Sequence, residues 1–131
     1  MTLVDGGWRE RASLASDGQC IRQDSAFRHW VGADSGAEFA AQPGRYHLYV
    51  SLARPWAHRT LNRLENVIGA TVVEPRMGRR SWDFGDDVIN QTDPLSGDEY
   101  LHEPYLRVGP HYTGHVTVPV LWDRARHDCQ Q

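Results

Sequence analysis

Apolar and polar residues alternate most regularly between positions 45 and 52. Large apolar side chains occupy every second position there, at Tyr46, Leu48 and Val50. This period of two is typical of a pleated β-strand, so a strand is predicted over 45–52. Pro55 follows after a short gap, and proline suits the first turn of a helix, where its missing N–H would have no partner anyway. The pattern therefore predicts a strand, a tight turn and a helix that begins at Pro55.

The rest of the chain predicts a small α/β domain. Residues 70–74 form a short β-branched run that predicts a second strand. Apolar residues at helical spacing over 100–106 predict a short helix, and residues 116–122 predict a third strand interrupted by Pro119. Residues 75–98 are rich in Gly, Asp, Pro and Asn and predict a long loop. Loops of this length in compact domains are more often functional than accidental.

The first third of the chain shows no sustained hydrophobic period. We interpret residues 1–43 as an extended N-terminal arm laid over a domain that occupies 44–131. A length of 131 residues suffices for one domain with a modest core. The 40% hydrophobic share with 24% charged residues is that of a globular chain and excludes wholesale disorder.

Charge and cysteine content exclude several classes of function. The formal net charge of -3 does not favour nucleic acid or an anionic membrane as a partner. No run of residues approaches a membrane span, and the first residues lack the pattern of a signal peptide. Cys20 and Cys129 lie near opposite ends, without the spacing of a metal or redox motif. A cytoplasmic, reduced protein is therefore predicted.

Position 54 is the position in this chain where a reactive side chain would be most strongly activated. It directly precedes the predicted helix, where free N–H groups and the positive end of the helix dipole converge. A thiolate would be stabilised there, but the chain has Arg54, which carries no sulfur and adds positive charge to a positive pole. Two interpretations of Arg54 stay open: a surface residue with its guanidinium in water, or a binding residue for an anion.

The segment around Arg54 closely resembles a known signature. Residues 44–60 read Gly-Arg-Tyr-His-Leu-Tyr-Val-Ser-Leu-Ala-Arg-Pro-Trp-Ala-His-Arg-Thr. Glutathionyl-hydroquinone reductases, the omega-like xi-class glutathione transferases, have the same run with cysteine at the position of Arg54. The resemblance covers nearly the whole chain and continues at residues 25–30, Trp82, Phe84, 100–105 and 111–123.

The resemblance implies a thioredoxin-like α/β fold, that of the N-terminal domain of glutathione transferases. In that fold a cis-proline faces the active-site helix, so Val118-Pro119 is expected to be cis; an ordinary trans proline on an edge strand is the alternative. Relatives continue after the position of Asp123 with His-Thr-Ile-Val-Ser-Asn-Glu-Ser, whereas this chain reads differently over 124–131. We therefore expect a domain truncated before its fourth strand, an unpaired edge on the third strand, and no C-terminal helical domain.

The end of the chain suggests a genetic origin for this difference. The relatives' Ile-Val-Ser-Asn-Glu can be encoded so that another reading frame gives Asp-Cys-Gln-Gln and a stop, which matches residues 128–131. Our hypothesis is a frameshift in a longer gene, and a chance match in a four-residue tail is the alternative.

The resemblance also implies which residues bind glutathione, the family's co-substrate. Trp82 matches a tryptophan that packs over bound glutathione, and a buried anchor for the long loop is its alternative role. His115 replaces an arginine that can hold a glutathione carboxylate, so its grip is expected to be weaker. Val118 would offer backbone N–H and C=O groups to the peptide part of glutathione, beside Pro119.

The helix that begins at Pro55 is expected to be altered relative to the family, and the histidines are not expected to bind a metal. The family has about seven residues between Leu61 and Leu64, where this chain has two, so residues are lost either from the helix body or from the helix end and the following loop. Trp56 is expected in the core and Arg59 in a structural role. No metal site is expected, because His102, His111 and His115 have no ligand-like spacing.

These observations predict a truncated relative of enzymes that reduce glutathionyl-hydroquinones with glutathione. Its activity is expected to be impaired, because Arg54 occupies the position of the nucleophilic cysteine and no other catalytic residue takes its place. The alternative is a noncatalytic module that binds glutathione or a partner. The partners implied by the family are small-molecule glutathione conjugates, without nucleic acid or membrane, and the family is typically homodimeric.

Overall fold

The computed structural model describes residues 2–10, 26–34, 36–64, 67–76, 78, 80–85 and 92–130. Cys20 lies outside these residues. The secondary-structure elements, in chain order, are β1 (Thr2–Val4), β2 (Gly7–Arg9), β3 (Tyr46–Val50), α1 (Pro55–Leu64), β4 (Gly69–Val72), α2 (His102–Val108), β5 (Val120–Asp123) and β6 (Asp128–Gln130).

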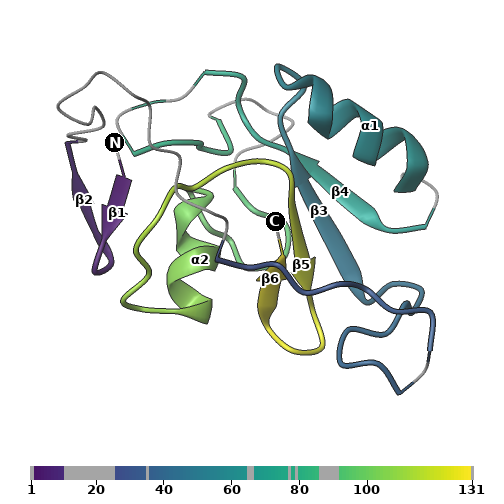
Figure 1. The fold of residues 1–131 in the computed structure, drawn as a ribbon. Helices are drawn as coiled ribbons and strands as arrows, with labels where there is room; N and C mark the ends of the chain where they lie inside the picture. The colour runs from purple at the N-terminus through teal and green to yellow at the C-terminus, as the bar shows by residue number, and fades with distance from the viewer. Residues whose placement is uncertain are drawn as a thin grey trace, which may run out of the picture.

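The centre of the molecule is a four-stranded mixed sheet in the order β4-β3-β5-β6 (Figure 1). Strand β3 pairs in parallel with β4 and antiparallel with β5, so that Leu48 lies opposite both Ala70 and Leu121. The parallel pair is joined through α1, as a parallel connection requires a crossover. Together with cis Val118-Pro119 directly before β5, this order is thioredoxin-like, and both expectations from the sequence are confirmed.

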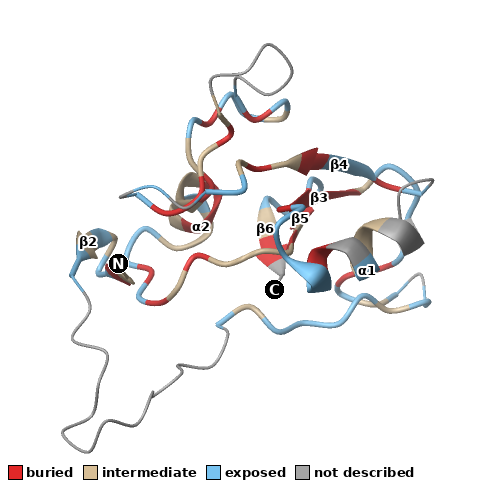
Figure 2. Cartoon of the chain, turned by 90° about the horizontal axis from the view of Figure 1, so that it is seen from above, coloured by how far each residue is buried: buried red, intermediate tan, exposed pale blue. Residues whose placement is uncertain are grey.

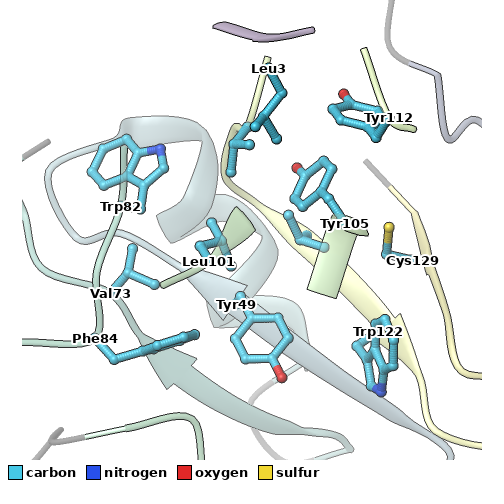
Figure 3. Packing of buried hydrophobic residues seen from close by; sticks show 12 residues of the cluster. Leu3, Tyr49, Val73, Trp82, Phe84, Leu101, Tyr105, Tyr112, Trp122 and Cys129 are labelled. Atoms are coloured by element: carbon cyan, nitrogen blue, oxygen red, sulfur yellow. The ribbon is translucent and has the colours of Figure 1, made fainter. Parts of the chain in front are cut away.

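Strand β3 is buried along its whole length, because both faces of the sheet are covered (Figure 2). Tyr46, Leu48 and Val50 pack on one face with residues of α1. Tyr49 points to the other face, into the larger core cluster shown in Figure 3. That cluster consists of Leu3, Tyr49, Val73, Trp82, Phe84, Leu101, Tyr105, Tyr112, Val116, Val120, Trp122 and Cys129.

The sheet has a fourth strand, which corrects the expectation of a domain truncated before it. Residues Asp128–Gln130 form β6 and pair antiparallel with β5, with Cys129 opposite Trp122. The turn between the two strands is held by Asp123, whose carboxylate accepts hydrogen bonds from the backbone N–H groups of Ala125 and Arg126 at 2.9 and 3.3 Å. Strand pairing uses backbone groups that almost any sequence supplies. A different sequence at this edge can therefore still cover β5.

Helix α1 begins at Pro55, as predicted, but Trp56 is not in the core. Ala57 is fully buried and Leu61 packs on the same cluster, so these two residues form the inward stripe of the helix. Trp56 lies one position, about 100° around the helix, from Ala57 and is 67% exposed. The expectation that Trp56 is a core residue was wrong, because a position inside the helix does not decide which face of the helix is buried, and the buried face is that of Ala57 and Leu61.

The start of the chain folds back on the domain as a hairpin. Strands β1 and β2 pair antiparallel, and the turn between them places Asp5 and Gly6 at positive φ values of 50° and 72°. Leu3 is fully buried and exchanges two backbone hydrogen bonds with Gly114, at 3.1 and 3.0 Å. Leu3 thus anchors the hairpin in the core cluster. Among the described residues, neither helix has the length and apolar character needed to cross a membrane.

Candidate functional site

Residue 54 stands at the start of α1, held by the turn that follows β3. The N–H of Arg54 donates to the carbonyl of Ser51 at 3.1 Å, and its own carbonyl accepts from the N–H of Ala57 at 3.0 Å. The Ser51 hydroxyl is buried and accepts from the N–H of Ala53 at 3.4 Å. A side chain at position 54 therefore projects beside the free N–H groups of the first turn of α1.

The Arg54 side chain lies against a tryptophan from the long loop. Its guanidinium carbon is 5.5 Å from the centre of the Trp82 ring, within the range of a cation–π contact. Arg54 is an exposed residue, whereas Trp82 is only 2% exposed. The structure thus brings together two residues that the sequence assigned to the same site.

Trp82 is held by backbone pairing on both sides of its position. Its carbonyl accepts a hydrogen bond from the N–H of Leu101, and the next carbonyl, of Asp83, accepts from the N–H of Glu74. Its indole belongs to the large core cluster. This geometry gives Trp82 the role of a loop anchor, and its contact with glutathione stays a prediction.

Within the described residues, the only cysteine is Cys129 in the middle of β6. Its thiol is fully buried against the core cluster, and burial raises its pKa well above the ordinary value. A buried thiol with a raised pKa is a poor nucleophile, because the thiolate is the reactive form. The described chain therefore offers no substitute for a thiolate at position 54.

The segment before β5 contains the remaining predicted site residues. His115, Val118 and Pro119 are all half-buried, and the Val118-Pro119 peptide bond is cis. Val118 packs against the core cluster that also contains Trp82, so both parts of the predicted glutathione site border one apolar cluster. Nδ1 of His115 lies 3.5 Å from the hydroxyl oxygen of Thr2 in β1.

Three hydroxyl-bearing residues hold this segment, and the sequence pattern indicated a functional role for none of them. Tyr105 had entered only as an apolar residue of a predicted helix, and Ser81 only as part of a loop. The signal in the sequence was weak, since a tyrosine with apolar neighbours reads as core. The contacts to residues 115–117 are Tyr112 Oη to the His115 carbonyl, Ser81 Oγ to the Val116 carbonyl, and Tyr105 Oη to the Thr117 carbonyl.

The three histidines considered as metal ligands contact the N-terminal hairpin instead of one another. His102 packs edge-on against Trp8 at 5.2 Å, and His111 pairs with Asp5 at 2.6 Å. His115 lies beside Thr2. In the part of the chain that the structure describes, no group of three His, Cys, Asp or Glu side chains is close enough to hold a metal ion.

Comparison with known proteins shows relatives along nearly the whole chain. No protein-family model matches it. The chain is 44% identical to glutathionyl-hydroquinone reductase YqjG of Escherichia coli over 139 residues, which cover 95% of this chain and 42% of that protein. It is 42% identical to glutathionyl-hydroquinone reductase PcpF of Sphingobium chlorophenolicum over 131 residues, which cover 93% of this chain and 40% of that protein.

Solved structures of similar fold come from the same group of proteins as the sequence relatives. The xi class glutathione transferase from Natrialba magadii superposes with a TM-score of 0.82 at 39% identity, covering 99% of this chain and 40% of that one. The glutathione-bound structure of YqjG from Escherichia coli gives a TM-score of 0.78 at 40% identity, covering 100% and 41%.

The sheet order, the cis-proline and these likenesses define the chain as a thioredoxin-like domain of the glutathione transferase class. Within that class it is a partial homologue of the glutathionyl-hydroquinone reductases, the xi-class glutathione transferases. It spans about two fifths of the length of the relatives that it matches (42% and 40% for the two reductases).

Proposed function

We propose that this chain is a catalytically impaired relative of the glutathionyl-hydroquinone reductases, which retains part of a glutathione-binding site. The observation that carries the proposal is the position of Arg54. It occupies the start of α1 and places a guanidinium over Trp82, where the family signature has a nucleophilic cysteine.

The chemistry of the reaction explains why this exchange matters. Reduction of a glutathionyl-hydroquinone by a thiol requires a thiolate to attack the conjugate's glutathione sulfur. A disulfide bond forms, the carbon–sulfur bond breaks with its electron pair left on the ring carbon, and that carbon takes up a proton from water to give the hydroquinone. The resulting mixed disulfide is then resolved by a second thiolate. A guanidinium stays protonated at every relevant pH, and its nitrogen lone pairs are delocalised over the cation and are not nucleophilic. Arg54 therefore cannot perform the first step.

The remaining geometry supports binding of glutathione without turnover, which is our second candidate function. Val118 is half-buried directly before β5, and its backbone N–H and C=O groups could pair with an extended peptide. His115 can offer one donor to a carboxylate, where an arginine would offer a paired fork. With few charged contacts, we expect glutathione to bind with a dissociation constant near or above about 1 mM.

Two measurements on the purified chain test this proposal together. The chain should not consume a glutathionyl-hydroquinone above the rate without protein. A titration with reduced glutathione, followed by amide NMR signals, should shift those of Val118 and His115. Turnover that follows the protein through purification would overturn the impaired assignment. Binding without turnover would favour the noncatalytic module, whereas absent shifts up to about 20 mM glutathione would exclude it.

The cellular setting is part of the same proposal. Small-molecule glutathione conjugates are the proposed ligands, and the cytoplasm, where glutathione keeps thiols reduced, is the proposed compartment. Fractionation of cells that express the chain tests this assignment, which fails if the chain is found outside the cytoplasm.

A further inference from the structure

Three consecutive carbonyl groups before the cis-proline are each bonded by a side-chain hydroxyl. These are Tyr112 Oη to His115 at 2.9 Å, Ser81 Oγ to Val116 at 3.4 Å, and Tyr105 Oη to Thr117 at 2.9 Å. All three hydroxyl-bearing residues are buried, and they come from different parts of the chain. Segment 115–117 is therefore held by side chains where a neighbouring strand would ordinarily supply the hydrogen bonds.

Tyr105 makes the most complete of these contacts. Besides donating to the Thr117 carbonyl, its hydroxyl oxygen accepts a hydrogen bond from the Thr117 N–H at 3.3 Å. Both backbone groups of the residue directly before Val118 are thus satisfied by one side chain. On the other side, Val120 is fixed in the sheet opposite Tyr49. Val118 lies between these two fixed points, and its backbone makes no hydrogen bond with another described residue.

The tyrosine rings are themselves held in place. Tyr105 is fully buried, and its ring contacts that of Phe27 at 5.7 Å and that of Tyr112 at 5.2 Å, while Phe27 and Tyr112 stack on each other at 5.4 Å. Figure 3 shows Tyr105 and Tyr112 side by side in the core cluster. Gly114 leaves room for the Tyr112 hydroxyl, since a Cβ at that position would lie 2.6 Å from it. Hydroxyls with such restricted positions can set the geometry of a segment, because their own rotamers are locked by packing.

We propose that Tyr105, assisted by Tyr112 and Ser81, is a positioning residue that holds the backbone of Val118 ready to pair with the peptide part of glutathione. The inference rests on the proposed function of binding glutathione. The hydroxyls do not touch the ligand. They order segment 115–118 before binding, so that the ligand does not have to bear the cost of ordering it.

The test compares Tyr105→Phe with Tyr49→Phe in the full chain. Tyr49 is a matched control, because it is also a buried tyrosine of the same core cluster and its hydroxyl donates to Asp93 at 2.8 Å, away from segment 115–118. We expect Tyr105→Phe to weaken glutathione binding about fivefold, the size of one hydrogen bond, and Tyr49→Phe to change it less than about twofold. Amide NMR signals report both binding and folding.

A second readout does not depend on the ligand. The measured quantity is the ratio of the hydrogen-exchange rate of the Thr117 amide to that of core amides. Tyr105→Phe should raise this ratio, because the acceptor of the Thr117 N–H is gone, whereas Tyr49→Phe should leave it unchanged. If Tyr105→Phe does not fold, Tyr112→Phe takes its place, with faster exchange across 115–117 and weaker glutathione binding expected.

The outcomes separate the two proposals. If the unmodified chain does not bind glutathione, the proposed binding function is overturned. The positioning role of Tyr105 in that binding is then overturned too, even if the Thr117 amide exchanges as expected. If the unmodified chain binds and Tyr105→Phe binds equally well, or if the Thr117 amide keeps its protection, the positioning role alone is overturned. The positioning role is supported if Tyr105→Phe, but not Tyr49→Phe, weakens glutathione binding and speeds exchange of the Thr117 amide.

Discussion

The guanidinium carbon of Arg54 lies 5.5 Å from the centre of the Trp82 ring. The contact joins the start of α1 to the long loop, and it places a fixed positive charge where a thiolate would otherwise be stabilised by the helix. A cation–π contact at an exposed site contributes about 0.5–1 kcal/mol, which is similar to the cost of a positive charge at a helix N-terminus. The two effects offset each other, so Arg54 is compatible with the fold although its side chain carries no sulfur.

Restoring cysteine at position 54 should restore a reactive thiol. In a Cys20→Ser background, we expect Arg54→Cys to react with iodoacetamide with a thiol pKa below about 8.5, because the first turn of α1 favours the thiolate. Glutathione disulfide should add one glutathionyl group, seen by mass spectrometry. Arg54→Ser in the same background is the control and should gain no such group. A thiol at position 54 with an ordinary pKa would show that the helix start does not activate it.

The N-terminal hairpin should contribute to stability through Leu3. Leu3→Ala removes a fully buried side chain from the core cluster, and we expect a loss of about 3 kcal/mol in the free energy of unfolding. Val4→Ala is a matched control, because Val4 is 44% exposed in the same strand, and it should cost less than about 0.5 kcal/mol. Urea unfolding measures both. Equal effects would mean that the hairpin does not pack in solution as it does here.

Asp123 should make the fold sensitive to acid. Its burial works to raise its pKa, but hydrogen bonds from Arg45 and from the N–H groups of Ala125 and Arg126 outweigh burial and lower the pKa. A lowered carboxyl pKa gives stability that is present above the unfolded value of about 4 and is lost as the pH falls through the folded value.

Asp123→Asn is the variant that checks this. It should cost about 2 kcal/mol at pH 7, as the loss of charge-assisted hydrogen bonds does, and should lose less stability than the unmodified chain below pH ~4. Glu38→Gln, which weakens an exposed pair with Arg126, should change little. Parallel acid-unfolding curves for the Asp123→Asn variant and the unmodified chain would contradict the assignment.

His47 should make the fold less stable below neutral pH. Burial lowers its pKa, Asp93 raises it and Arg124 lowers it further, while its Nε2 lies 2.7 Å from the Thr71 hydroxyl. Because the folded pKa is below the unfolded value of about 6.5, stability should be full above that pH and decline as the pH falls through it. Urea midpoints at pH 7.5 and pH 5.0 measure the decline. The loss of stability between these two pH values should be smaller in His47→Gln and unchanged in His111→Gln, whose side chain is exposed.

Gly114 should tolerate a side chain poorly, and the Tyr112 hydroxyl should account for part of the cost. Gly114 has a φ of 158°, which L residues rarely adopt, and a Cβ there would lie 2.6 Å from Tyr112 Oη and 2.9 Å from Cζ. Gly114→Ala should therefore cost about 1–3 kcal/mol through overpacking and backbone strain. Adding Tyr112→Phe should recover part of this cost, since one of the two close contacts disappears. A thermal-unfolding double-mutant cycle measures the coupling, and purely additive effects would show that the two residues do not meet.

The sequence by itself determined the elements whose signal is local. The alternation at Tyr46, Leu48 and Val50 and the position of Pro55 were sufficient to predict β3 and the start of α1, because strand and helix periodicity act over a few neighbouring residues. The long motif around Arg54 was sufficient to predict the thioredoxin-like fold and the cis bond at Val118-Pro119, both of which the structure shows.

Only the tertiary structure decided the features that depend on partners distant in sequence. The pairing of β6 with β5 uses backbone groups that carry no sequence signature, so the expected missing strand was wrong. Trp56 faces outward because the inward stripe of α1 is set by packing on β3, which periodicity over one short helix does not fix. The hydroxyl of Tyr105 finds Thr117 only after α2 and the segment before β5 pack together, because a hydrogen bond depends on distances that are set by the folded chain.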